Sequence, residues 1–155
     1  MQKYTKRLLG VAAVAGLLLT GCTKPEPAVT IWSGSTSMNT DPVCWSGEAD
    51  ALDPGDCAAE ILQGDGINGA TLFEAAVGNT VGFSVDPEIA EIGWNIVVEG
   101  AEGQAQPITP NPLTTTYYRF TFPSAGAEGL PLQIVAGTDG QIRGIWSFRI
   151  TPVQS

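Results

Sequence analysis

The chain has 155 residues, of which 7 are basic, 16 are acidic and none is histidine, so its formal net charge at pH 7 is −9. A surface with this excess of carboxylates repels phosphate backbones, which excludes nucleic acid as a partner. Without histidine, the chain lacks the commonest general base near neutral pH and every Ser-His-Asp or Cys-His catalytic scheme. We therefore expect a protein that is not an enzyme.

The first residues have the three-part layout of an export signal. The basic part contributes three positive charges, from Lys3, Lys6 and Arg7. An apolar run over residues 8–19 and small residues before Cys22 complete the layout. Because a membrane-spanning helix needs about 20 apolar residues, this run is too short for a permanent span. We predict a signal peptide over residues 1–21 that is removed from the mature chain.

Residues 19–22 read Leu-Thr-Gly-Cys and match all four positions of the lipobox, so the chain resembles bacterial lipoproteins. The resemblance implies a diacylglycerol on the sulfur of Cys22, cleavage after Gly21, and often a further acyl chain such as palmitate on the new amino group. Two acyl chains anchor a protein stably, whereas one binds only marginally. We expect an extracytoplasmic protein, on the outer face of the cell membrane or on the outer membrane of a Gram-negative cell. The alternative is an ordinary secretory signal with a chance cysteine.

The mature chain is more acidic than the precursor. Loss of three of the seven basic residues leaves four against 16 acidic residues, a net charge of −12. Such a chain does not adhere to anionic lipid through charge, so the lipid must hold it. Residues 22–27 are polar and Pro-rich, and we predict a lipidated tether there. Residues 28–155 are long enough for one domain with its own core.

Short runs of alternating apolar residues, separated by Gly and Pro, indicate β-strands in this domain. We predict strands over residues 28–32, 80–85, 94–98, 117–122, 132–136 and 145–150, and a seventh near 43–45. This pattern is typical of an all-β protein, and we predict an immunoglobulin-like β-sandwich of about seven short antiparallel strands. Residues 58–63 suit a turn or two of helix, residues 70–77 suit either helix or strand, and residues 100–116 suit a long loop.

The four tryptophans divide into two groups. Trp94 and Trp146 fall on alternating apolar faces, so we expect them in the core. Trp32 and Trp45 lie near strand ends, where they could stack on sugars or on a partner protein.

Assigning Cys22 to lipid leaves two of the three cysteines. Cys44 and Cys57 lie 13 positions apart, and the turn sequence Asp-Pro-Gly-Asp at residues 53–56 comes between them. In an oxidising compartment this spacing predicts a structural disulfide. A redox pair or a metal site is the alternative, although the spacing is not C-x-x-C.

The region between Asp41 and Asp65 is rich in carboxylates, which Ca²⁺ prefers as ligands in flexible loops. A calcium site would use Asp50, Asp53 and Asp56, the nearest evenly spaced set. The spacing does not fit an EF-hand loop, however, and a solvated acidic loop is the simpler interpretation. We expect no cofactor other than the lipid on Cys22, with Ca²⁺ as the alternative.

Parts of the mature chain resemble an actinobacterial lipoprotein family of unknown function with an immunoglobulin-like domain. The resemblance rests on the lipobox, on DPVCW at residues 41–45, on VDPEIA at 85–90 leading to Gly93-Trp94, and on Tyr-Tyr-Arg-Phe at 117–120. It implies a cell-envelope location and no known catalytic residues. We expect a binding or accessory module of the envelope, whose partner is an envelope protein or glycan. A calcium-binding structural module is the alternative.

Overall fold

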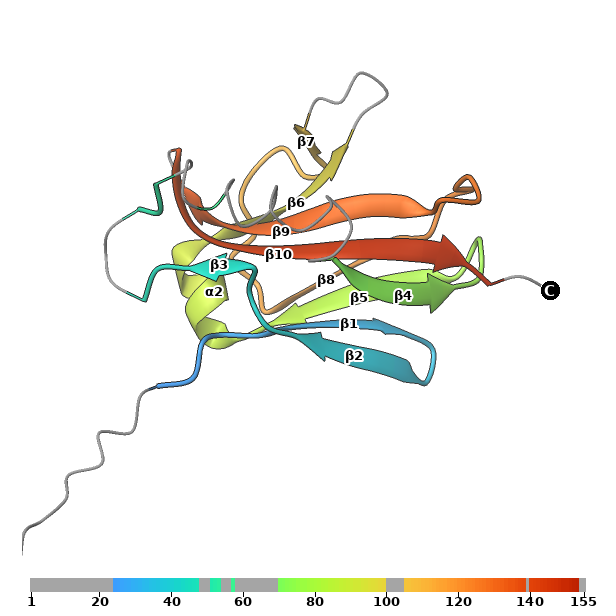
Figure 1. Ribbon diagram of the computed structural model, residues 1–155, viewed down its shortest axis with the longest axis horizontal. Helices are drawn as coiled ribbons and strands as arrows, with labels where there is room; N and C mark the ends of the chain where they lie inside the picture. The colour runs from blue at the N-terminus through green and yellow to red at the C-terminus, as the bar shows by residue number, and fades with distance from the viewer. Residues whose placement is uncertain are drawn as a thin grey trace, which may run out of the picture.

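Two β-sheets pack face to face in this computed structural model, which describes residues 24–47, 51–53, 57, 70–99, 105–138 and 140–153 (Figure 1). The first sheet contains β1 (Val29–Ser33), β2 (Thr36–Thr40), β5 (Thr80–Val85) and β8 (Tyr117–Thr121). Its strands are antiparallel and follow the order β2-β1-β5-β8. The second sheet contains β3 (Cys44–Trp45), β4 (Thr71–Ala75), β6 (Trp94–Glu99), β7 (Ala105–Pro107), β9 (Leu130–Thr138) and β10 (Gln141–Pro152). Its order is β3-β10-β9-β6-β7, and β4 also pairs with β10.

The strand order is that of an immunoglobulin-like sandwich. In that fold, strands A, B and E share one sheet, and strands C, F and G share the other. Here β1, β5 and β8 lie side by side as A, B and E do, and β6, β9 and β10 lie side by side as C, F and G do. Between β5 and β6 the chain crosses from the first sheet to the second through the short helix α2 (Pro87–Ile92). The predicted all-β, immunoglobulin-like sandwich is therefore confirmed.

The described residues form ten strands rather than about seven. All seven predicted segments are strands, and β2, β4 and β7 are additional, so the ambiguous segment 70–77 contains a strand. The predicted long loop 100–116 contains β7, which pairs with β6. One pair, β4 with β10, is parallel and departs from the predicted antiparallel arrangement. The helix predicted over residues 58–63 lies outside the described residues.

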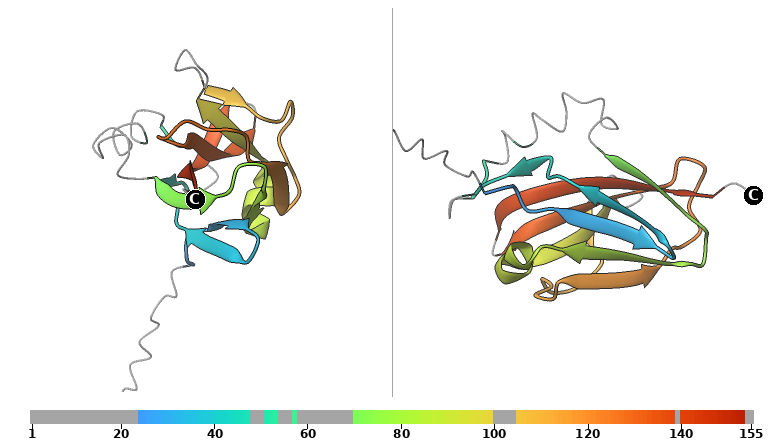
Figure 2. Two further views of the ribbon diagram at one scale, coloured as in Figure 1. Left: turned by 90° about the vertical axis from the view of Figure 1, so that its right-hand side faces the viewer. Right: turned by 90° about the horizontal axis from the view of Figure 1, so that it is seen from below.

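Alternating side chains of the strands fill the space between the two sheets. Figure 2 shows the two sheets from two further sides. In β5, Val81, Phe83 and Val85 are all buried, as predicted. Trp94 and Trp146 are fully buried, which confirms them as core residues. The rings of Phe83 and Phe148 meet edge to face across the interface, with centroids 5.1 Å apart.

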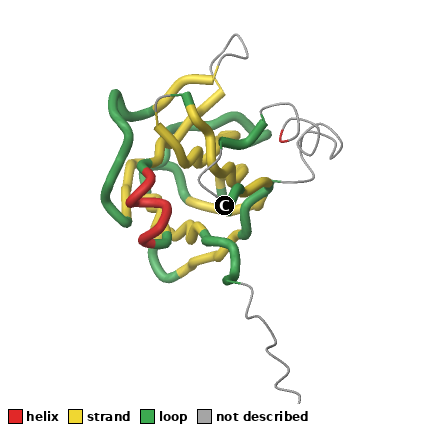
Figure 3. Tube along the Cα trace, turned by 90° about the vertical axis from the view of Figure 1, so that its left-hand side faces the viewer, coloured by secondary structure: helices red, strands yellow, loops and turns green. Residues whose placement is uncertain are grey.

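The sandwich has two distinct ends. Figure 3 looks onto the end that carries α2, drawn in red, and the segment leading into β1 lies beside this helix (Figure 1). The turn between β1 and β2 and the end of β10 lie at the opposite end of the molecule (Figure 1).

Candidate functional site

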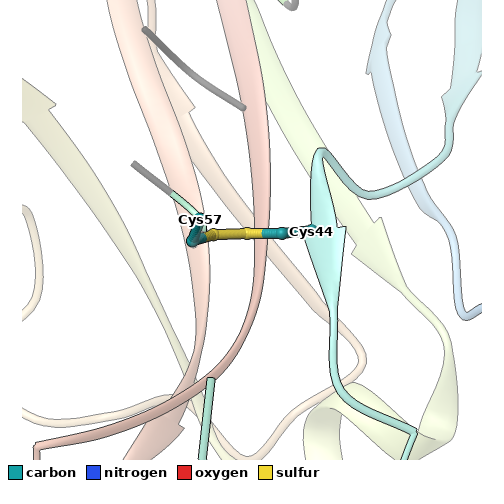
Figure 4. The surroundings of a disulfide bond; sticks show 2 residues. All are labelled: Cys44 and Cys57. Atoms are coloured by element: carbon teal, nitrogen blue, oxygen red, sulfur yellow. A yellow bond between two sulfur atoms is a disulfide. The ribbon is translucent and has the colours of Figure 1, made fainter. Parts of the chain in front are cut away.

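The disulfide between Cys44 and Cys57 lies at the edge of the second sheet (Figure 4). Cys44 begins β3, and its Cα atom lies 5.8 Å from that of Cys57, a separation typical of disulfides. Cys57 is 3% exposed, and its N–H donates to the carbonyl of Asp53 at 3.3 Å. The structure therefore brings the predicted cysteine pair together.

Backbone hydrogen bonds fasten the chain around Cys44 to β10. Three N–H groups donate to carbonyls of β10: Val43 to Ile145 at 2.7 Å, Ser46 to Arg143 at 2.8 Å and Leu52 to Ile142 at 2.7 Å. Residues 43–46 and Leu52 thus cover the first part of the β10 edge, and the disulfide ties Cys57 to Cys44 there. An uncovered strand edge pairs readily with other chains, so this cover protects the sheet.

Two tryptophan rings close over Gly144 in β10. The centroids of Trp45 and Trp146 lie 5.8 Å apart, and the rings are tilted by 50°. A Cβ atom at Gly144 would lie 2.5 Å from Trp45 Cε3 and 2.7 Å from Trp146 Cη2, so the rings fit only over glycine. The guanidinium of Arg143 lies 5.7 Å from the Trp45 ring centroid and also donates to the carbonyl of Ser46 at 3.1 Å. Trp45 is half-buried and lies against both Trp146 and Arg143.

An open pocket of about 300 Å³ lies beside the disulfide. Its walls are Glu26, Pro42, Val43, Cys44, Trp45, Leu52 and Cys57. The surface that these walls expose is about equally polar and apolar, and Glu26 contributes a carboxylate to it. Among these described lining residues there is no pair of nucleophile and general base.

The candidate calcium ligands are only partly described. Asp50 and Asp56 lie outside the described residues, whereas Asp53 is exposed and its carbonyl accepts the Cys57 N–H. Within the described ranges, no three acidic, cysteine or histidine side chains gather closely enough to hold a metal ion. The set Asp50, Asp53 and Asp56 stays a prediction.

The segment before β1 is attached to the start of α2. The N–H of Ala28 donates to Asp86 Oδ2 at 2.9 Å, and the N–H of Asp86 donates to the carbonyl of Ala28 at 3.3 Å. Asp86 occupies the N-cap position, but its carboxylate binds Ala28 and makes no cap hydrogen bond to α2. Lys24 forms an ion pair with Glu88 in the first turn of α2, and Pro27 is buried.

These contacts shorten the tether predicted over residues 22–27. Lys24 pairs with Glu88, Glu26 lines the pocket beside the disulfide and Pro27 is buried, so these three residues already contact the domain. Cys22 and the predicted signal peptide lie outside the described residues, so lipidation stays a prediction. In the part of the chain that the structure describes, no helix has the length and apolar content needed to cross a bilayer.

Trp32, which the sequence suggested as a residue that could stack on a sugar or a partner protein, lies in an aromatic patch on the outer face of the first sheet. The Trp32 ring lies against Gly82, where a Cβ atom would come within 2.1 Å of Trp32 Cζ2. Its Nε1–H donates to Ser84 Oγ at 3.2 Å. Cross-strand register places Arg119 opposite Gly82 and Tyr117 opposite Ser84 on the same face, and Tyr117 is 60% exposed.

The patch depends on the register between strands that are far apart in the sequence, so a local pattern could not place Gly82, Tyr117 and Arg119 beside Trp32.

Comparison with protein-family models, with characterised proteins and with solved structures finds no match for this chain.

Proposed function

We propose that the chain is an extracytoplasmic lipoprotein, held on a membrane by diacylglycerol on Cys22, whose β-sandwich acts as a binding or accessory module of the cell envelope. The membrane is the cell membrane, on its outer face, or the outer membrane in a Gram-negative cell. The partner is an envelope protein or glycan.

The pairing of Cys44 with Cys57 carries this proposal. The chain has three cysteines, so Cys22 is left without a thiol partner inside the chain. Cys22 also ends the Leu-Thr-Gly-Cys motif that follows a basic and an apolar segment. Structural disulfides persist in oxidising compartments outside the cytoplasm. The disulfide and the export signal therefore support the same location.

The outer face of the first sheet supports a binding role. Trp32 and Tyr117 place aromatic rings there beside Arg119. Aromatic residues and arginine are enriched in contact surfaces, because they bury large areas and keep polar groups available. An immunoglobulin-like sandwich is a rigid frame on which such a face can act.

Intact-mass analysis of the native, membrane-extracted protein tests the anchor. We expect a mature chain that begins at Cys22 and carries diacylglycerol there, with or without a further acyl chain. Cys22→Ala should abolish lipidation and release the protein from the membrane fraction, whereas the matched Cys44→Ala/Cys57→Ala variant should still be lipidated. An unmodified N-terminus, or a start at another residue, would refute the proposal.

Affinity capture from detergent-solubilised envelope tests the binding role. The native protein serves as bait, and the double variant Tyr117→Ala/Arg119→Ala serves as a matched bait with an altered sheet face. We expect an envelope component that the native bait retains and the variant bait loses. Equal recovery by both baits would contradict a role for this face.

A further inference from the structure

We propose that the α2 end of the sandwich faces the membrane and that the turn between β1 and β2 points away from it. This inference rests on the proposed lipidation of Cys22. It follows from where the chain is fastened to the domain and from how little chain precedes that point.

The point of attachment lies at the α2 end. Two hydrogen bonds join Ala28 to Asp86, one to the Asp86 carboxylate and one between the two backbones, and Pro27 before them is buried. Pro27 and Ala28 thus already belong to the folded domain. The ion pair between Lys24 and Glu88 extends this attachment toward Cys22. Because Lys24 is 75% exposed, that pair is weak and tightens the attachment without fixing it.

The chain between Cys22 and the point of attachment is short compared with the length of the domain. An extended chain spans at most about 3.6 Å per residue, so the five steps from Cys22 to Pro27 reach about 18 Å. When Lys24 is paired with Glu88, two steps remain, which reach about 7 Å. The β10 strand has 12 residues, and at about 3.3 Å each it runs about 40 Å along the molecule. The tether therefore cannot bring both ends equally close to the membrane unless the domain lies flat.

Charge disfavours the flat arrangement. Even at the α2 end the acidic residues, Glu26, Asp86, Glu88 and Glu91 against the single cation of Lys24, are held near the membrane only by the lipid anchor. Over the whole mature chain the net charge is −12, from four basic and 16 acidic residues. Anionic lipid headgroups repel such a surface, so the domain stands on its tether and does not adhere along its length.

This arrangement decides what a partner meets. The turn at Gly34 and Ser35 between β1 and β2, the turn at residues 77–79 and the last residues of β10 form the membrane-distal end. The outer face of the first sheet, with Trp32 and Tyr117, then runs roughly parallel to the membrane normal. Partners can therefore approach it from the side.

Energy transfer to the membrane surface tests the orientation. A donor-labelled noncanonical amino acid replaces either Glu91 on α2 or Ser35 in the β1–β2 turn, both of which are exposed. The lipidated protein is reconstituted into vesicles of phosphatidylcholine and phosphatidylglycerol with a headgroup-labelled acceptor lipid. We expect several-fold more efficient transfer from position 91 than from position 35. Circular dichroism and Tm confirm that both labelled proteins are folded.

A linker variant provides the matched control. Ten Gly and Ser residues inserted between Thr23 and Lys24 add about 17 Å of flexible reach, which should reduce the difference between the two positions. Equal transfer from both positions in the native-length protein, with lipid on Cys22 confirmed by intact mass, would overturn the orientation and leave the proposed function standing. A protein without lipid on Cys22 would overturn both.

Discussion

Removing the disulfide tests how the chain between β2 and β4 is held. The double variant Cys44→Ala/Cys57→Ala opens a loop whose ends lie 13 positions apart. In the chain-entropy model, a loop of this size contributes about 3 kcal/mol to the free energy of unfolding. About 134 residues remain after a signal of 21 is removed from 155. With an unfolding entropy of about 2.1 cal/mol/K per residue, the loss corresponds to about 11 °C in Tm.

The local effect should appear along the β10 edge. The N–H groups of Val43, Ser46 and Leu52 donate to β10 beside the disulfide. Without the cross-link, the segment opens more often, so these amides should exchange with deuterium faster. Amides of β9, which lies between β10 and β6, should keep their protection. Hydrogen exchange read by mass spectrometry separates the two sets.

Reduction of the native protein is the control, because it breaks the bond and retains both sulfur atoms. Thermal unfolding in detergent, followed by circular dichroism, should show a similar loss of Tm on adding reductant to the native protein. The double variant should not respond to reductant. A variant that melts within about 2 °C of the native protein would refute the loop-entropy reasoning.

Three further predictions follow from other parts of the molecule. Gly82→Val should displace the Trp32 ring, because a Cβ atom there would lie 2.1 Å from Trp32 Cζ2; we expect a loss of about 1–3 kcal/mol and a red shift in fluorescence, and an unchanged spectrum would contradict the close contact. Asp86→Ala removes the acceptor of the Ala28 N–H and should lower stability by about 1 kcal/mol, whereas Asp86→Asn should retain most of it; equal losses in the two variants would argue against that hydrogen bond. Millimolar Ca²⁺ should leave the Tm unchanged, and a rise that a chelator reverses would revive Asp50, Asp53 and Asp56 as ligands.

The alternation of apolar and polar residues predicted those strands that have one buried and one solvent-exposed face. In β5, Val81, Phe83 and Val85 are buried while Thr80 is exposed, so period two was visible in the sequence. β2 was not predicted because both of its faces are largely exposed, Met38 at 41%. Pairing between its backbone and that of β1 makes it a strand. Such pairing requires no particular side chains, so the sequence shows no alternation of apolar and polar residues there. The same holds for β7, whose three residues are all exposed.

The local sequence pattern could not predict which strands pair with one another or which side chains pack closely across distant strands. The pairing of Thr71–Ala75 with β10 is parallel, and a parallel pair needs a long crossover that no short pattern reports. Asp86 precedes helix α2, which begins with Pro-Glu, and this is a helix-start signature. Six residues are nevertheless too few to show helical periodicity. The cysteine pair was predictable because only three cysteines had to be assigned. The packing of Trp45 on Trp146 was not, because it depends on space above Gly144 in a distant strand.

Two short strands, β3 and β4, share one edge of β10, and this explains why the disulfide lies beside β3. β9 occupies one side of β10, and the other side is shared between β3, which pairs at Gly144 and Ile145, and β4, which pairs over residues 148–152. β3 has two residues, so its ladder alone is a weak cover, and the cross-link from Cys44 to Cys57 holds the weaker half in place. Structural disulfides form and persist mainly in oxidising compartments. On the proposed location, the sheet edge is therefore fully secured only after export, when the domain already stands at the membrane.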